Sequence, residues 1–125
     1  MMIYLDTHVL VYLYQGDFSQ FSPRVTQIIE SESCLISGAV ALELAYLFES
    51  GRIKYPGMTI IEYLSRYIDL SICTLPGSII ALKAMDLSWT RDPFDRLIVA
   101  NAACEDKPLV TKDRLITQHY PRVIW

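Results

Sequence analysis

Four carboxylates occupy equivalent positions in this sequence, each just past a short apolar run or within the first turns of a helix pattern. They are Asp6, Glu43, Asp95 and Asp113. Carboxylates gathered in one place repel one another unless a cation neutralises them, and oxygen ligands alone favour a hard cation such as Mg²⁺ or Mn²⁺. Such an ion can activate water against a phosphodiester and stabilise the leaving oxygen. The four acids therefore predict metal-assisted hydrolysis of a phosphodiester, provided that the fold brings them together.

The elements that carry these acids alternate between short strands and helices. We expect strands at Met2–Leu5, Cys34–Ile36, Ser71–Leu75, Pro108–Val110 and Arg122–Trp125. We expect helices at 8–15, 38–50, 59–69, 76–87, 93–103 and 115–120, with one more opened by Ser22 and Pro23 and closed by the polar segment 31–33. This alternation predicts an α/β fold with a mostly parallel sheet covered by helices on both faces. Ligands bind past the carboxyl ends of such strands, so the four acids should share one crevice.

The segment 89–103 reads WTRDPFDRLIVANAA and predicts a helix whose entrance is acidic. Pro93 suits the first helical position, and Asp92 suits the N-cap before it. Asp92 and Asp95 then lie near the positive end of the helix dipole. One interpretation assigns them only to capping and to the dipole, and the other assigns them to chemistry. Glu43, which interrupts an apolar helix series, is either a solvated residue or one half-buried against a partner or an ion.

Residues beside the acids also have alternative interpretations. The basic residues Arg91, Arg96, Lys112 and Arg114 either hold the phosphates of a nucleic-acid substrate or form ordinary salt bridges with the same acids. Thr7 is a candidate cap for the helix at 8–15. His8 is either a substrate contact or, as is more common on a first helical turn, a structural hydrogen-bond donor. The aromatic residues Tyr12, Tyr14, Tyr46 and Phe48 follow helical spacing, which is typical of core or oligomer-interface positions.

Length and composition limit the class of protein. The 125 residues, 52% of them hydrophobic, fit a single domain spanning residues 1–125 with a core of its own. The net charge of −3 argues against a broadly basic nucleic-acid face but allows a local basic rim around an acidic site. Cys34, Cys73 and Cys104 are odd in number and widely spaced, which argues against disulfides and zinc and favours a reducing cytoplasm. No apolar run approaches the ~18 residues of a membrane span, and no secretory leader is expected.

Four motifs follow one another along nearly the whole chain: YLDTHVLVYL, ISGAVALELAYL, RDPFDRLIVANA and LVTKD. In the second motif, Ser37 lies six residues before Glu43. With these motifs in this order and spacing, the chain resembles the PIN-domain family and, within it, the VapC-type toxin ribonucleases of bacterial toxin–antitoxin pairs.

The resemblance implies a three-layer α/β/α PIN fold with a mostly parallel central sheet and a Mg²⁺- or Mn²⁺-dependent endoribonuclease. It assigns the catalytic and metal-binding positions to Asp6, Glu43, Asp95 and Asp113. Thr111 matches the hydroxyl residue that supports the last acid in the family, and Asp92 belongs to the DPFD variant of the third motif. His8 stands where many relatives have a small hydroxyl residue, so no family role is carried over to it. The resemblance also implies a homodimer and a small antitoxin protein that covers the groove.

The leading hypothesis is a cytoplasmic endoribonuclease that hydrolyses RNA as the toxin of a type II toxin–antitoxin system. One alternative is a PIN-fold RNA-processing nuclease outside such a pair. Another is a non-catalytic nucleic-acid-binding PIN module, although loss of function would usually remove an acid and all four are present. A receiver-like domain with an aspartate nucleophile would need a DxD pair or a switch lysine, and neither follows Asp6.

Overall fold

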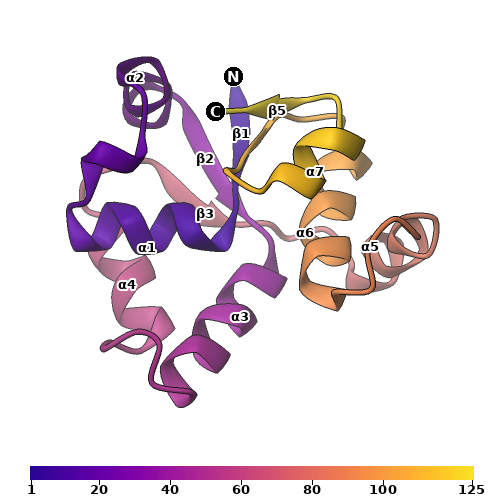
Figure 1. The fold of residues 1–125 in the computed structure, drawn as a ribbon, viewed down its shortest axis with the longest axis horizontal. Coiled ribbons are helices and arrows are strands. Elements are labelled where there is room, and N and C mark those ends of the chain that lie inside the picture. The colour runs from indigo at the N-terminus through magenta and orange to yellow at the C-terminus, as the bar shows by residue number, and fades with distance from the viewer.

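Five short parallel strands form the centre of the structure, a computed structural model that describes residues 1–125 (Figure 1). The strands are β1 (Met2–Leu5), β2 (Ser33–Ile36), β3 (Leu70–Ile72), β4 (Leu109–Val110) and β5 (Val123–Ile124). Their order across the sheet is β3-β2-β1-β4-β5, and every neighbouring pair is parallel. The first strand is therefore central, and the chain winds outward from it in both directions. The predicted parallel α/β sheet is confirmed.

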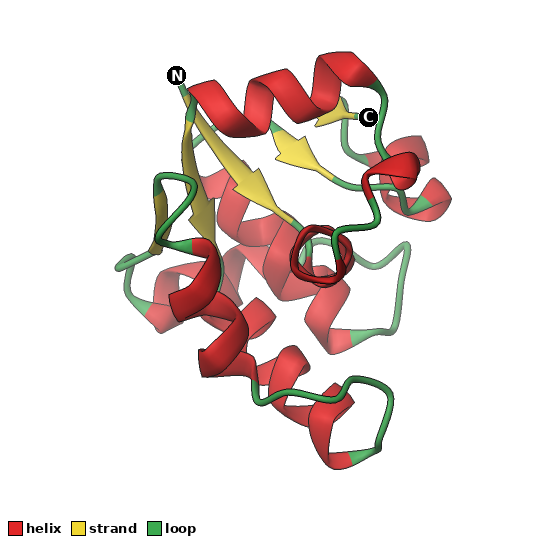
Figure 2. Ribbon diagram, turned by 90° about the vertical axis from the view of Figure 1, so that its left-hand side faces the viewer, coloured by secondary structure: helices red, strands yellow, loops and turns green.

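Helices cover both faces of this sheet. They are α1 (Thr7–Gln15), α2 (Pro23–Ser31), α3 (Gly38–Glu49), α4 (Gly57–Leu64), α5 (Gly77–Ala84), α6 (Pro93–Cys104) and α7 (Arg114–His119), with a short 3₁₀ helix η1 at Phe18–Gln20. Figure 1 shows α1, α2 and α4 on one side of the strands and α5, α6 and α7 on the other. Helix α3 contacts α1, α4 and α6, and so joins the two sides. Figure 2 shows the strands side by side between these layers, which confirms the three-layer α/β/α architecture.

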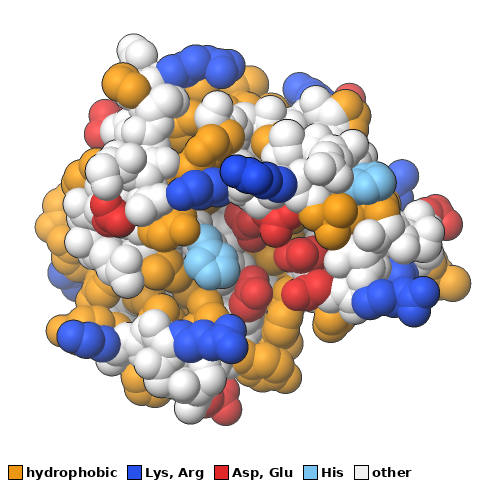
Figure 3. Space-filling view, viewed as in Figure 1, with side chains coloured by type: hydrophobic (Ala, Val, Ile, Leu, Met, Phe, Trp, Pro, Cys, Tyr) orange, Lys and Arg blue, Asp and Glu red, His pale blue; other side chains and the backbone are white.

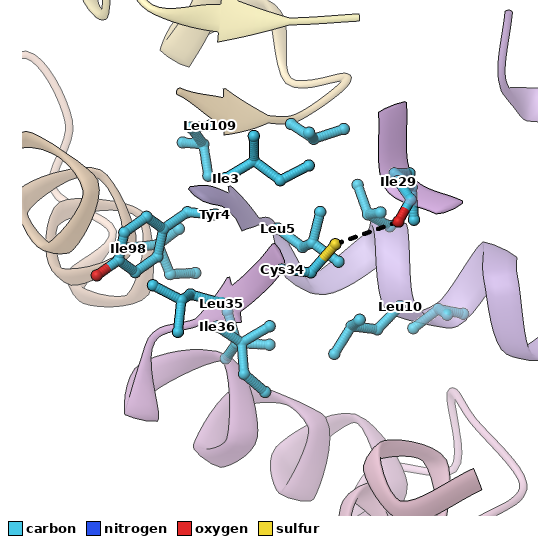
Figure 4. Close-up of a cluster of buried hydrophobic side chains, with 14 of the residues drawn as sticks. Ile3, Tyr4, Leu5, Leu10, Ile29, Cys34, Leu35, Ile36, Ile98 and Leu109 are labelled. Atoms are coloured by element: carbon cyan, nitrogen blue, oxygen red, sulfur yellow. Dashed lines mark hydrogen bonds between the residues drawn. The ribbon is translucent and has the colours of Figure 1, made fainter. Parts of the chain in front are cut away.

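The core is built around β1, whose side chains alternate between the two helical layers. Ile3 and Leu5 point to one side, and Tyr4 points to the other, towards Ile98 of α6 (Figure 4). All four side chains are buried. A strand that is buried on both faces needs a continuous apolar run, which explains why MIYL shows no polar alternation. The apolar run ends at Leu5, where the chain leaves the sheet and reaches the first acid.

The boundaries predicted around α4 and β3 were wrong by several residues. Helix α4 begins at Gly57 and ends at Leu64, whereas the sequence pattern predicted 59–69. A Cβ on Gly57 would lie 2.9 Å from Leu44 Cβ, so the glycine lets α4 pack closely against α3. Strand β3 is Leu70–Ile72 rather than 71–75, because its three residues pair with Cys34–Ile36 of β2.

The helix predicted at 76–87 is also shorter, since α5 spans only Gly77–Ala84. The end of α3 agrees with the prediction, because Gly51 follows its cap with a φ of +77°. Two of the four aromatic residues assigned to the core or an interface are exposed, with Tyr46 at 54% and Phe48 at 40% exposure. None of the helices has both the length and the apolar character needed to cross a bilayer.

Candidate active site

Asp6 lies directly after β1 and has both carboxylate oxygens fixed by hydrogen bonds. The backbone N–H of Thr7 donates to Oδ1 at 2.7 Å, and the Thr111 hydroxyl donates to Oδ2 at 2.6 Å. The side chain is only 8% exposed. Asp6 is also the N-cap residue of α1, so the prediction that Thr7 caps this helix was wrong. Because both of its oxygens accept hydrogen bonds, the buried Asp6 carboxylate has one fixed orientation towards a ligand that binds beside it.

Thr7 has a different role that the sequence did not reveal. Its side chain is fully buried, and its hydroxyl donates a hydrogen bond to Oε1 of Glu43. One residue therefore contacts two acids, because its backbone N–H binds Asp6 and its hydroxyl binds Glu43. The signal in the sequence was a hydroxyl residue directly after the first acid. Glu43 is half-buried in α3, and so the solvated interpretation of this residue was wrong.

Asp92 and Asp95 lie at the entrance of α6, as predicted. Oδ1 of Asp92 accepts hydrogen bonds from the backbone N–H groups of Phe94 at 2.8 Å and Asp95 at 3.2 Å. This confirms Asp92 as the N-cap residue. Asp92 is exposed, whereas Asp95 is half-buried and its carboxylate accepts no hydrogen bond from the protein. The two acids are therefore distinct, since one is used by the backbone and the other is left free.

Asp113 follows β4 and is connected to Asp6 through Thr111. Oδ1 of Asp113 accepts a hydrogen bond from Ile116 N at 2.9 Å, which makes Asp113 the N-cap residue of α7. The backbone N–H of Asp113 donates to the Thr111 hydroxyl at 3.1 Å, and the same hydroxyl donates to Asp6. The fully buried Thr111 thus orients both the acid of β1 and the loop that carries Asp113.

These side chains line one cleft with a volume of about 430 Å³. Its lining residues are Asp6, His8, Val9, Tyr12, Glu43, Asp92, Asp95, Lys112 and Asp113. Figure 3 shows the acidic side chains gathered in a hollow at the centre of this face, with basic side chains along the upper rim. The structure therefore brings together all four predicted acids, and it places Asp92, the exposed His8 and Lys112 beside them.

Burial, together with repulsion between neighbouring carboxylates, raises the pKa of three acids in the cleft. Burial, followed by repulsion from Asp92 and Asp6, raises the pKa of Asp95 from 3.8 to about 7. Burial also raises the pKa of Asp6, although its hydrogen bonds from Thr111 and Thr7 lower it. The pKa of Glu43 is raised mainly by burial, against the hydrogen bond from Thr7. Buried and clustered carboxylates of this kind are stabilised in their ionised form when a cation neutralises them.

The four basic residues named from the sequence lie in different surroundings. Only Lys112 lines the acidic cleft, and its Nζ donates to Oε1 of Gln20 at 2.6 Å and lies 5.8 Å from the centre of the Tyr12 ring. Arg96 is used inside the fold, because its Nε donates to the backbone carbonyl of Thr90 at 2.7 Å. Arg91 and Arg114 are exposed outside this cleft.

Of the two interpretations of these basic residues, the one in which they form salt bridges with the acids is contradicted. The ion pairs of the chain join the N-terminal amino group to Glu32 and Arg122 to Asp106. The acidic cleft therefore has no internal counter-charge in direct contact with its carboxylates.

The donor set of the cleft fits a hard divalent cation. The acidic side chains that line the cleft offer carboxylate oxygens, and no cysteine lines it. No three acidic, histidine or cysteine side chains close around a common point as a complete metal site. Mg²⁺ requires no such enclosure, since it keeps several waters and uses one or two carboxylates together with substrate phosphate oxygens. Asp6, Glu43, Asp95 and Asp113 are the residues that could hold the ion.

Sequence comparison identifies the protein family to which this fold and its acidic cleft belong. The family model described as PIN domain matches residues 3–120. The chain belongs to the PIN domain family. The chain is also 32% identical to Ribonuclease VapC22 of Mycobacterium tuberculosis, with 98% of this chain and 95% of that protein covered.

Solved structures share the fold at lower sequence identity. The VapBC2 complex of Rickettsia felis bound to a DNA fragment from its promoter contains a chain with a TM-score of 0.69 and 19% identity, covering 99% of this chain and 96% of that chain. The VapBC-1 structure from nontypeable Haemophilus influenzae gives a TM-score of 0.67 and 18% identity, covering 100% and 96% respectively. The PIN fold expected from the motifs is therefore confirmed.

Proposed function

We propose that this protein is a divalent-metal-dependent endoribonuclease and the toxin of a type II toxin–antitoxin pair. The observation that carries the proposal is the convergence of Asp6, Glu43, Asp95 and Asp113 on one cleft. The name of the curated relative supports RNA as substrate, and the VapBC structures support a protein antitoxin as partner. We extend the proposal to action in the cytoplasm and to a homodimer as the solution state.

In this proposal the acids have separate roles. Thr7 and Thr111 fix the orientation of Asp6, and Thr7 also fixes Glu43, so two carboxylates are preorganised before any ligand binds. The Asp95 carboxyl, with a pKa of about 7, exchanges a proton near neutral pH and becomes a full ligand when that proton leaves. When bound, a divalent ion would supply water activation and stabilisation of the leaving oxygen.

Lys112 and His8 complete the proposed substrate contacts. Lys112 lies in the lining of the cleft without an acidic partner, so its ammonium group is available to an RNA phosphate. His8 is exposed in the same lining and lies with its ring 6.3 Å from that of Tyr12. Both residues therefore face a substrate strand from the side of α1 and β4, opposite the entrance of α6.

The proposal is tested by cleavage of a structured RNA under single-turnover conditions. We expect cleavage in millimolar Mg²⁺ or Mn²⁺, none with EDTA, and none by Asp6→Asn with either ion. Asp6→Asn keeps the shape of the side chain, and circular dichroism checks that the variant is folded. An intact fold without cleavage in any metal would instead favour the alternative of a non-catalytic nucleic-acid-binding module.

The toxin assignment needs a separate test, because an RNA-processing nuclease would pass the first one. A short reading frame directly upstream of the gene should encode a protein that forms a complex with this chain and inhibits cleavage. Growth arrest on expression, relieved by that second protein, is the expected result. An active nuclease without such a partner would support the RNA-processing alternative.

A further inference from the structure

A second cleft adjoins the acidic cleft and has a different character. It has a volume of about 500 Å³ and is lined by Thr111, Lys112, Arg114, Thr117, Gln118 and Trp125. We call it the Trp125 cleft. Lys112 lines both clefts, and so the Trp125 cleft lies next to the acidic cleft at this residue. The Trp125 cleft contains no acid, and its volume falls within the ~300–1,000 Å³ of small-molecule sites.

Trp125 gives this cleft a fixed aromatic surface. The indole is half-buried and packs against Phe21, with ring centres 5.3 Å apart and planes inclined by 53°. It also packs against the main hydrophobic core. An aromatic ring that is anchored on one side and open on the other is the arrangement on which nucleic-acid bases stack.

Two positive charges line the Trp125 cleft, and one of them, Lys112, also lines the acidic cleft. Lys112 is held in place by its hydrogen bond to Gln20. Arg114 is the first residue of α7, is exposed, and forms no ion pair. In a chain with a net charge of −3, such local charges attract phosphates to one particular side of the acidic cleft. On the side of α6, Arg96 is committed to the carbonyl of Thr90, and Arg91 is exposed but lines neither cleft.

We propose that the Trp125 cleft is a nucleotide subsite in which single-stranded RNA flanking the cleaved bond is bound. One base stacks on Trp125, and the adjoining phosphates lie against Lys112 and Arg114. The exposed side chains of Thr117 and Gln118 offer polar atoms to the edge of that base. The inference rests on the proposed nuclease function and adds to it a position and a direction for the substrate strand. It concerns unpaired RNA, because only an unpaired base can leave its stack for a protein ring.

The test measures binding separately from cleavage. The protein carries Asp95→Asn, so that the RNA remains intact, and Trp89→Phe, so that Trp125 is the remaining tryptophan of the two in the sequence. A single-stranded oligoribonucleotide is titrated in Mg²⁺ while tryptophan fluorescence is recorded. We expect quenching of Trp125 and a Kd that rises with salt. Adding Trp125→Ala should weaken binding, measured by fluorescence anisotropy of labelled RNA, by roughly 5- to 150-fold, the effect of losing one stacked base.

Matched variants distinguish a subsite from a general loss of structure. Trp125→Phe should retain most of the binding, because the phenyl ring preserves the stacking surface. Arg114→Gln should reduce the slope of log Kd against log salt by about 0.7, the contribution of one phosphate contact to a single strand. Tyr67→Ala removes an aromatic residue that is 69% exposed outside both clefts and should leave binding unchanged.

The outcomes separate this inference from the nuclease proposal. Normal RNA binding by folded Trp125→Ala and Arg114→Gln variants would overturn the subsite, even if the parent protein cleaves RNA. A protein without cleavage activity whose RNA binding still depends on Trp125 would retain the subsite and lose the nuclease. Absence of Trp125 quenching by any RNA, together with quenching by a protein partner, would reassign the cleft to that partner and overturn the proposal.

Discussion

The Thr111 hydroxyl donates a 2.6 Å hydrogen bond to Oδ2 of Asp6 from 105 residues further along the chain. Both residues are buried, and the same hydroxyl accepts a hydrogen bond from Asp113 N. This contact joins the ends of β1 and β4, which are neighbouring strands of the sheet. The orientation of the first acid thus depends on a residue that is not itself a carboxylate.

Replacing Thr111 by valine should therefore impair both stability and cleavage. Valine has nearly the same shape, but it leaves Asp6 Oδ2 and the Asp113 N–H without a partner. We expect a loss of ~1–3 kcal/mol in the free energy of unfolding, measured by urea denaturation. Cleavage should fall by roughly 10- to 100-fold, as is usual when a residue that orients a metal ligand is lost. Thr111→Ser keeps the hydroxyl and should lose much less activity, so equal activity of Val and Ser variants would contradict this role.

Asp95 and Asp92 should respond differently to conversion into asparagine. Asp95→Asn removes a free carboxylate from the cleft, and we expect cleavage to fall by at least about 1,000-fold, equivalent to ~4 kcal/mol. Asp92→Asn should retain substantial activity, because asparagine caps a helix as well as aspartate does. In circular dichroism at neutral pH, Asp92→Asn should melt close to the parent protein, and Asp95→Asn should melt at the same temperature or higher, because it removes a half-buried carboxylate. Full activity of Asp95→Asn with loss in Asp92→Asn would reverse their assigned roles.

Divalent metal should stabilise the folded protein. An ion that binds the native cleft and not the unfolded chain stabilises by RT ln(1 + [L]/Kd), which is ~2.7 kcal/mol at a concentration of 100 Kd. Melting in Mg²⁺ or Mn²⁺ should therefore occur at a higher temperature than in EDTA. The shift should shrink in Asp6→Asn, which lacks one ligand charge. An identical Tm in all conditions that support cleavage would exclude direct binding by these acids.

The stability of the metal-free protein should fall as pH rises towards neutrality. The pKa of Asp95 is about 7 in the folded protein, above its ordinary value of 3.8, so the folded state binds more protons than the unfolded state in this interval. Stability contributed by such a group is fully present below pH ~4 and is lost as pH rises through about 7. Raised pKa values of Asp6 and Glu43 act in the same direction.

Urea denaturation in EDTA at several pH values measures this dependence. Asp95→Asn should flatten the plot of unfolding free energy against pH between pH 5 and pH 8. Saturating Mg²⁺ should counter the loss of stability with rising pH, because the ion competes with the protons for the carboxylates. If the parent protein instead became more stable across this interval in EDTA, ionisation of these acids would not destabilise the folded protein, and the prediction would be wrong.

Local signals in the sequence were sufficient for some features and not for others. The Asp92 cap and the start of α6 follow from a DP pair before an apolar series, and both depend only on adjacent residues. The role of Thr7 could not be predicted, because its hydrogen-bond partner Glu43 is 36 residues away. The start of α4 depends on contact between Gly57 and Leu44 of another helix.

The basic residues also separate what local sequence can predict from what depends on distant contacts. The sequence placed positive charges beside the acids, but charge alone does not reveal partners. Arg96, in α6, binds the backbone carbonyl of Thr90, and Lys112 binds Gln20, 92 residues earlier in the chain, so neither partner is an acid. The Trp125 cleft was not predicted, because it combines β5 with α7, and nothing in the spacing of Trp125 and Arg114 shows that they face the same space.

The order of the strands also determines when during synthesis the four acids can come together. A nascent chain that ends before β4 can already hold Asp6 and Glu43 near β1 and β2, yet it lacks Thr111 and Asp113. The central strand then has an open edge, and Asp6 Oδ2 has no partner. If the acids form the nuclease site proposed above, the ribosome and its message are exposed to the active form only after nearly the whole chain has emerged. If the chain is also the toxin proposed above, this delay gives its antitoxin time to be present first.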